Sequence, residues 1–296
     1  MSPMAFLEKP VRWLEAVSKY RAATSGGPNF AYDLCVRKVT AEHKRDLDLS
    51  AWTLAFNGSE AVRAETLERF ARAFAECGFR RESSFPCYGL AEATLFVTGG
   101  RQERHTGCAP RTAQPAVDCG RPGANHAVLI VDPKTRIPCP EGQAGEIWVA
   151  GPSVARGYWN RPEESRNTFR ATPVGCSSRT LTDLPGTLCI PYKLKSEASF
   201  LRTGDLGLLD NGRLYVTGRI KDLIMIRGRN FYPQDIEHVL TDRVEALRPG
   251  GCAAFSVAIG DEESLVVVGG AWPRPDPPGR LRGDFCVFAK KPCRDL

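Results

Sequence analysis

The chain has 296 residues, 42% of them hydrophobic, which is enough for one or two domains with a packed core. Its formal net charge is +6, and its Lys and Arg residues are scattered among acidic residues. This distribution favours a solvated surface, and we expect no nucleic-acid partner. A docking patch for an acidic partner is the alternative. No run reaches the roughly 18 consecutive apolar residues of a membrane span, and charges interrupt the N-terminal residues, so we expect a cytoplasmic protein without a signal peptide.

The eleven cysteines include no CxxC pair, and the four histidines are dispersed along the chain. This spacing does not favour a structural zinc site. We therefore expect reduced thiols.

The first half of the chain carries signals for both helices and strands. Residues 10–20 and 65–77 place apolar side chains at helical spacing, and Gly78 is a typical residue to end the second helix. Residues 126–131 and 145–150 are β-prone runs bounded by turn formers, which predicts two strands.

The second half continues this mixture. A hairpin is predicted over 206–217, a short strand over 222–226, and a helix over 232–240. Residues 253–259 and 265–268 indicate another hairpin. The order of elements predicts an α/β (mixed α+β) fold with more than one sheet.

The composition predicts a domain boundary near Gly218. Residues 1–217 form the larger part and 218–270 a smaller one, whereas 271–296 are rich in proline and arginine without apolar periodicity. We expect this last segment to be disordered.

Two short segments contain residues suited to binding a nucleotide. In YGLAEAT at 88–94, a tyrosine ring can lie flat on a purine, and the carboxylate of Glu92 can hold a hard cation that neutralises phosphate charge. In RTGDLG at 202–207, Asp205 can accept hydrogen bonds from a ribose diol. A buried tyrosine with a surface glutamate, and an ordinary aspartate turn, are the alternatives.

A third segment, residues 218–230, surrounds a β-strand with four cations. This density of positive charge suits the binding of a polyanion. The common explanation is an edge strand whose charges prevent it from pairing with other chains. Each of the three signals is weak by itself, but their order and separations are informative together.

The combined pattern resembles the core motifs of the acyl-adenylating superfamily, which includes acyl-CoA synthetases, luciferases and the adenylation domains of peptide synthetases. The segments that carry the resemblance are YGLAEAT at 88–94, GEIWVAGPSVARGYWNRPEES at 145–165, LRTGDLG at 201–207 and GRIKDLIMIRGRNFYPQDIE at 218–237. The variants SGGPNFAYDLC at 25–35, FNGSEAVRAETLERF at 56–70 and NFYPQDIE resemble the fatty acyl-AMP ligase branch.

The resemblance implies ATP and Mg²⁺ as cofactors and assigns a role to each motif residue. Tyr88 would stack on adenine, Asp205 would bind the ribose hydroxyls, and Glu92 would act in catalysis by holding Mg²⁺ on the ATP phosphates. Arg219 would assist at the ribose or phosphate, and Lys221 would occupy the hinge where the small domain swings. The other wall of the base pocket would be formed by Asn57, Gly58, Ser59 and Glu60.

The implied reaction joins a fatty acid to ATP, giving acyl-AMP and pyrophosphate, and then passes the acyl group to a thiol of an acyl carrier protein. A polyketide or peptide synthase is a further implied partner. Because charge accumulates on phosphate, catalysis would depend on positioning and electrostatic stabilisation.

The chain also departs from the family pattern. The Gly, Ser and Thr-rich phosphate loop and the lysine near the end of the C-terminal domain have no match here, since neither Lys290 nor Lys291 lies in a matching context. Residues 176–195 form an atypical insertion. We therefore expect a chain that is truncated at both ends and that adenylates poorly or not at all by itself. Residues 1–217 would be the C-terminal part of the large AMP-binding domain, and residues 218–270 would be the hinge and a truncated small C-terminal domain.

Two other functions remain open from the sequence. A degenerate homologue could bind a nucleotide or acyl group, or dock on carrier proteins, without turnover. An acyl-CoA synthetase would transfer to free CoA, which fits the general motifs but fits the two fatty acyl-AMP ligase variants less well.

Overall fold

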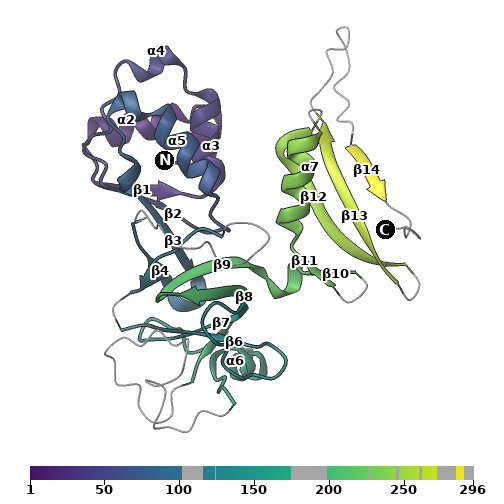
Figure 1. Cartoon of the computed structure of the whole chain (residues 1–296). Helices are drawn as coiled ribbons and strands as arrows, with labels where there is room; N and C mark the ends of the chain where they lie inside the picture. The colour runs from purple at the N-terminus through teal and green to yellow at the C-terminus, as the bar shows by residue number, and fades with distance from the viewer. Residues whose placement is uncertain are drawn as a thin grey trace. The chain divides into compact units, whose positions relative to one another are not determined.

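A computed structural model describes residues 1–101, 116–123, 125–174, 199–226, 229–244, 247–259, 262–271 and 285–289. The chain divides into two compact units, Met1–Thr217 and Gly218–Leu296. Figure 1 shows helices and strands in both units, which confirms the predicted mixed α/β fold class. In the described residues, no helix is long and apolar enough to cross a membrane.

The first unit begins with helices that flank a parallel sheet. Strands β1, β2 and β3 run parallel, in registers that pair Thr24 with Leu54 and Ala55 with Ser84. Helix α3 connects the first two strands and α5 the next two, so this part consists of two consecutive βαβ units. The elements are α1 (Pro3–Glu8), α2 (Val11–Lys19), β1 (Thr24–Gly27), α3 (Asn29–Lys38), α4 (Ala41–Lys44), β2 (Leu54–Asn57), α5 (Ala64–Ala73), η1 (Ala75–Cys77), η2 (Arg81–Ser83) and β3 (Ser84–Leu90).

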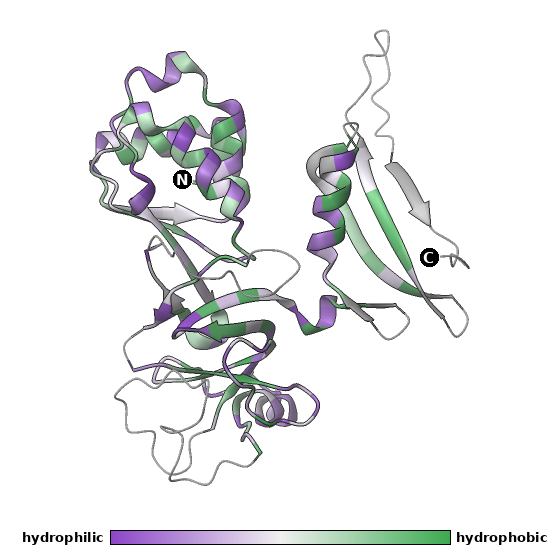
Figure 2. Cartoon of the chain, viewed as in Figure 1, coloured by the Kyte–Doolittle hydropathy of each residue, from purple (hydrophilic) through white to green (hydrophobic). Residues whose placement is uncertain are grey.

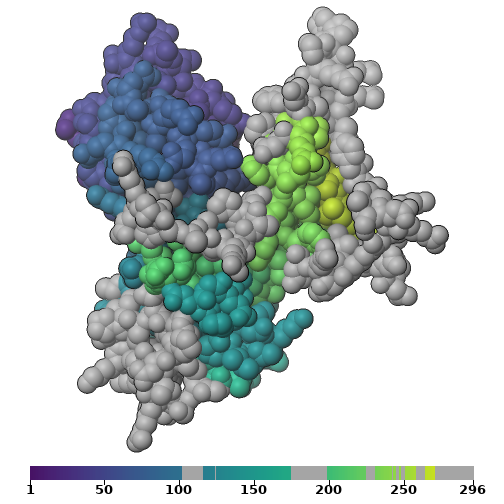
Figure 3. Space-filling model, viewed as in Figure 1, coloured from purple at the N-terminus to yellow at the C-terminus, as the bar shows by residue number. Residues whose placement is uncertain are grey.

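An aromatic core holds these helices against the sheet. Trp52 is fully buried and packs edge-on against three aromatic rings. The centroid of its ring lies 5.3 Å from that of Trp13, 5.4 Å from that of Phe79 and 6.0 Å from that of Phe70. Figure 2 shows hydrophilic and hydrophobic residues interspersed along the helices, and α5 buries Leu67, Phe70 and Ala71 on one face. In the space-filling view the purple and blue N-terminal helices form one closely packed body (Figure 3).

The parallel sheet is extended by two antiparallel strands, and a second sheet follows. Strand β4 pairs with both β3 and β5, giving the order β1-β2-β3-β4-β5. The second sheet has the order β6-β7-β8-β9. The elements are η3 (Ala91–Ala93), β4 (Leu95–Gly99), β5 (Arg121–Pro122), β6 (Ala127–Val131), β7 (Gly145–Ala150), α6 (Pro162–Phe169), β8 (Leu201–Asp210) and β9 (Arg213–Arg219).

Residues 118–122 contact both sheets. Cys119 and Gly120 exchange backbone hydrogen bonds with Leu214 of β9 at 2.8 and 2.9 Å, and the next two residues form β5 beside β4. Gly120 has a φ of +74°, and a Cβ there would lie 2.0 Å from the carbonyl carbon of Gly99. Only glycine tolerates both conditions, so this position sets how the sheets meet.

The second unit contains a helix and two small antiparallel sheets. Strands β12 and β13 pair from Cys252 with Gly269 to Ile259 with Glu262. The elements are η4 (Ile220–Asp222), β10 (Ile224–Ile226), β11 (Arg229–Phe231), α7 (Pro233–Arg243), β12 (Leu247–Ile259), β13 (Glu262–Ala271) and β14 (Phe285–Ala289). Pro233 begins α7, at the position where its missing N–H is tolerated.

Three details differ from the sequence predictions. The helix predicted over 65–77 ends its α-helical part at Ala73 and finishes as the 3-10 turn η1 before Gly78, whose φ is +82°. Asp222 belongs to η4 and not to the following strand, because Leu223 donates to Ile220 across that turn. Residues 285–289 form β14, although disorder is predicted for 271–296; the run FCVFA is β-prone and its backbone pairs with β13. The predicted insertion at 176–195 lies outside the described residues.

Candidate functional site

Tyr88 and Asp205 come from different sheets and meet in the core. The Tyr88 hydroxyl donates to Asp205 Oδ2 at 2.7 Å, and the two residues are 8% and 6% exposed. A separation of 2.7 Å is typical of an O–H···O hydrogen bond. The structure thus brings together two of the sequence-predicted site residues that lie 117 positions apart.

Asp205 is presented by an irregularity in β8. The register of β7 with β8 pairs Trp148 with Arg202 and Glu146 with Leu206, so one residue of β7 faces three of β8. A bulge of this kind bends the strand and redirects a side chain. Here the redirected residue is Asp205, whose carboxylate points to Tyr88 of the other sheet.

Glu92 lies four residues after Tyr88, in the turn η3. Its Oε1 accepts a hydrogen bond from the Tyr158 hydroxyl at 2.8 Å, and its backbone oxygen accepts one from the Ala155 N–H at 2.8 Å. The pKa of Tyr158 is raised to about 12, mainly by burial and further by the hydrogen bond to Glu92 and the charge of Glu92. The phenol therefore stays protonated and acts as the donor. The Tyr158 ring packs edge-on against Phe169 at 5.0 Å.

The backbone after Glu92 is strained and is held by side chains. Thr94 and Leu95 have φ values of +54° and +74°, which cost about 1–3 kcal/mol each in non-glycine residues and persist only where neighbours fix them. The Thr94 hydroxyl donates to the Ser153 carbonyl at 2.6 Å, and the Ser153 hydroxyl donates to the Ala93 carbonyl at 2.7 Å.

His126 completes this network. Its Nε2 lies 2.6 Å from Ser153 Oγ. Because the Ser153 proton is given to the Ala93 carbonyl, which can only accept, Ser153 Oγ must accept from His126, and Nε2 carries the proton. The turn containing Glu92 is therefore attached to the loop 151–158 by side-chain and backbone hydrogen bonds.

The predicted base-pocket residues follow β2. Asn57 is fully buried and Gly58 is buried against Cys87, the residue before Tyr88, whereas Ser59 and Glu60 are exposed. Ser59 has a φ of +72°, which turns the chain away from the sheet. This loop therefore lies beside β3 next to Tyr88.

Asn29, which the sequence did not single out, holds both ends of this loop. Its Oδ1 accepts from Asn57 Nδ2 at 3.1 Å and from the Arg63 N–H at 3.2 Å, and its Nδ2 donates to the Ala61 carbonyl at 2.8 Å. Asn29 lies within the segment SGGPNFAYDLC, so the sequence motif includes this residue but does not predict its hydrogen bonds.

Arg219 and Lys221 belong to the second unit, Arg219 as the last residue of β9 and Lys221 within η4. Both are exposed. Their predicted roles at the ribose, the phosphate and the hinge stay predictions.

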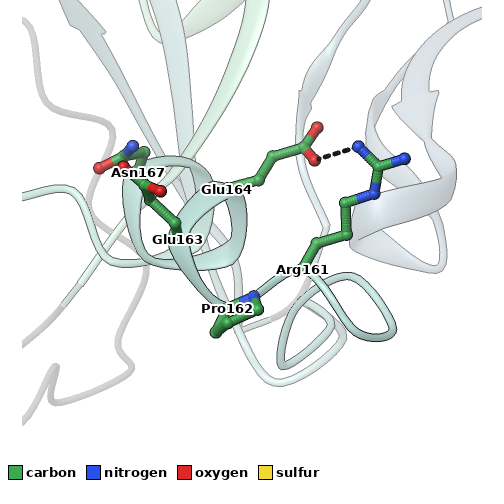
Figure 4. Close-up of a pocket in the computed structure, with 5 residues that line it drawn as sticks. All are labelled: Arg161, Pro162, Glu163, Glu164 and Asn167. Atoms are coloured by element: carbon green, nitrogen blue, oxygen red, sulfur yellow. Dashed lines mark hydrogen bonds and ion pairs between the residues drawn. The ribbon is translucent and has the colours of Figure 1, made fainter.

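A hollow of about 510 Å³ opens at the first turn of α6 (Figure 4). Its lining includes the ion pair between Arg161 and Glu164 at 3.3 Å, with Glu163 beside it. None of the predicted site residues lines this hollow, and its two carboxylates do not suit a phosphate.

A family model described as AMP-binding enzyme matches residues 1–159. The chain belongs to the AMP-binding enzyme family. Its relatives include proteins named as ligases of fatty acids, which confirms the resemblance predicted from the sequence.

Three relatives illustrate this similarity. The chain is 45% identical to the medium-chain-fatty-acid–(acyl-carrier-protein) ligase JamA of Moorena producens, over 90% of this chain and 45% of that protein. It is 41% identical to the ligase TtuA of Teredinibacter turnerae, which has the same description, over 100% of this chain and 46% of that protein. The solved fatty acyl-adenylate ligase of Legionella pneumophila, in complex with acyl adenylate and pyrophosphate, has a TM-score of 0.64 and 44% identity, covering 94% of this chain and 48% of that one. The chain therefore spans less than half the length of each relative.

Proposed function

We propose that this chain provides the adenosine-binding part of a fatty acyl-AMP ligase, which joins a fatty acid to ATP to give acyl-AMP and pyrophosphate. The observation that carries the proposal is the buried hydrogen bond between Tyr88 and Asp205. It couples the residue proposed for the base to the residue proposed for the ribose, so one nucleoside can contact both.

The nucleoside would lie between the motifs that meet at this hydrogen bond. The Tyr88 ring would face adenine, and residues 57–60 would form the other wall. An ionised carboxylate can accept from more than one donor, which is what recognition of the two ribose hydroxyls by Asp205 requires.

Glu92 fits a magnesium ion that arrives with ATP. In the described residues, no group of three or more His, Cys, Asp or Glu could hold a metal ion without help. Mg²⁺ in nucleotide sites is commonly held by one or two carboxylates together with substrate phosphates, so a single glutamate suffices. The ion would neutralise phosphate charge, and Arg219 and Lys221 would act at the ribose or phosphate and at the hinge.

The acyl substrate and acceptor are proposed from the relatives. JamA and TtuA are named as ligases of medium-chain fatty acids and acyl carrier protein. We propose a fatty acid as the carboxylate substrate and a carrier-protein thiol, alone or in a polyketide or peptide synthase, as the acceptor. We also propose a cytoplasmic location, where thiols such as those of the buried Cys35 and Cys119 stay reduced.

The adenosine site is tested by titrating the chain with AMP in a calorimeter. We expect the wild type to bind, and Asp205→Asn to bind at least about tenfold more weakly, because a hydrogen bond to a charged group is lost. Asp210→Asn, at the end of the same strand with its carboxylate bonded only locally to Asn211, is the matched control and should bind as the wild type does. Absence of AMP binding, or equal affinities of all three proteins, would contradict the proposal.

The acyl part is tested with a non-hydrolysable acyl-adenylate analogue. If the site takes a fatty acyl-AMP, the analogue should bind more tightly than AMP, since its chain adds apolar contact area. An analogue that binds no better than AMP would argue against a fatty substrate while leaving the adenosine site intact.

A further inference from the structure

The bulge that presents Asp205 is held by a buried carboxylate outside the motif that contains Asp205. Glu146 of β7 is 2% exposed. Its carboxylate accepts from Arg202 Nη2 at 2.8 Å, from Trp148 Nε1 at 2.9 Å and from the Gly204 N–H at 3.2 Å. Arg202 immediately precedes the bulge and Gly204 lies at its centre, so one carboxylate ties both of them to β7.

Thr203, between Arg202 and Gly204, makes the second attachment. Its hydroxyl donates to the Ile147 carbonyl at 2.7 Å and accepts from the Asp205 N–H at 3.1 Å. The first bond fixes the bulge to β7, and the second fixes the backbone of Asp205 itself.

The conformation of the bulge explains why it needs these attachments. Gly204 has a φ of +72°, and a Cβ there would meet nothing within 4 Å. On the side where a Cβ would lie, nothing packs against Gly204. Hydrogen bonds supply the restraint: Glu146 accepts from the Gly204 N–H, and the Thr203 hydroxyl accepts from the Asp205 N–H.

We propose that Glu146 and Thr203 are positioning residues that hold the β8 bulge so that the Asp205 carboxylate faces the ribose of the bound nucleotide. Neither side chain needs to touch the nucleotide. They act through Asp205, and the inference rests on the proposed function because the ribose contact of Asp205 is part of it.

The experiment compares AMP with 2′,3′-dideoxy-AMP, which lacks both ribose hydroxyls. The ratio of their dissociation constants measures recognition of the diol and leaves out the base and phosphate contacts that both ligands share. In the wild type we expect AMP to bind at least about tenfold more tightly. Thr203→Val keeps the shape of the side chain but removes both hydrogen bonds, and should reduce this preference about fivefold or more while the affinity for dideoxy-AMP stays unchanged.

Two further variants separate positioning from a general loss of structure. Thr203→Ser restores the hydroxyl and should recover the wild-type ratio. Thr66→Val removes the hydroxyl of another buried threonine, on α5, which donates to Asp33 of α3 at 3.1 Å, and should leave the ratio unchanged. Glu146→Gln should reduce the ratio as Thr203→Val does, and amide hydrogen exchange at Asp205 should be faster in both variants.

The outcomes distinguish the two proposals. A wild type that binds the two ligands equally would overturn the ribose role of Asp205 and, with it, the positioning role. A wild type that prefers AMP, together with a Thr203→Val variant that keeps the full preference, would overturn the positioning role alone. Loss of affinity for both ligands in equal proportion would also count against it.

Discussion

Removing the Tyr88 hydroxyl tests the contact that joins the two sheets. Tyr88→Phe keeps the ring in place and deletes the donor to Asp205 Oδ2, an interaction of 2.7 Å between residues that are 8% and 6% exposed. Because the acceptor is a carboxylate and both partners are buried, we expect a loss of about 1.5–3 kcal/mol in the free energy of unfolding. Tyr20→Phe, whose residue is 74% exposed, should change that free energy by less than about 0.5 kcal/mol.

A double-mutant cycle with Asp205→Asn isolates the pair. Urea unfolding followed by tryptophan fluorescence is a suitable assay, since four of the five tryptophans precede residue 218. The coupling energy between the two substitutions should be about 1–3 kcal/mol, as for residues in direct contact. A coupling energy below about 0.5 kcal/mol would refute the reasoning, because independent sites behave additively.

Three further predictions concern the core, the pH dependence and the thiols. Trp52→Ala should lower the free energy of unfolding by about 3–5 kcal/mol in urea denaturation, whereas Trp159→Ala, at a residue 90% exposed, should have little effect. Burial and the contact with Glu92 raise the pKa of Tyr158 from 10.0 to about 12. The contribution of the protonated phenol to the free energy of unfolding is therefore complete below pH 10 and is lost as the pH rises towards 12. In thermal denaturation, the melting temperature of Tyr158→Phe should fall less between pH 10 and pH 12 than that of the wild type. Burial raises the pKa of Cys35 and Cys119 to about 12, so mass spectrometry should find both unalkylated by iodoacetamide at pH 8 until the chain is unfolded, and rapid native labelling would contradict their burial.

The sequence predicted those features that depend on local patterns. Helix α2 follows the apolar spacing of residues 10–20, and β6 and β7 follow β-prone runs bounded by turn formers. Such elements are recognisable because their signal lies within about 10 residues. Strand β14 was missed because the surrounding prolines and arginines dominate the composition, while its pairing with β13 is not visible in its own residues.

The candidate site was predicted only in part, for the same reason. The resemblance named Tyr88 and Asp205, but the bond between them depends on how two sheets meet. Glu146 and Tyr158 lie within a motif of the family, but the resemblance gives them no role. The hydrogen bonds from Arg202 to Glu146 and from Tyr158 to Glu92 are contacts between distant parts of the chain. Their side-chain types alone do not predict these partners.

The segment 118–122, which belongs to both sheets, has a consequence for the order of folding. Contacts near in sequence form early, whereas those between distant residues must wait for the closure of long loops. The two βαβ units can condense from neighbouring residues, whereas β9 pairs with Cys119 and Gly120, and Asp205 contacts Tyr88, across much longer separations. We therefore expect the contact between Asp205 and Tyr88 to be among the last of the first unit to form.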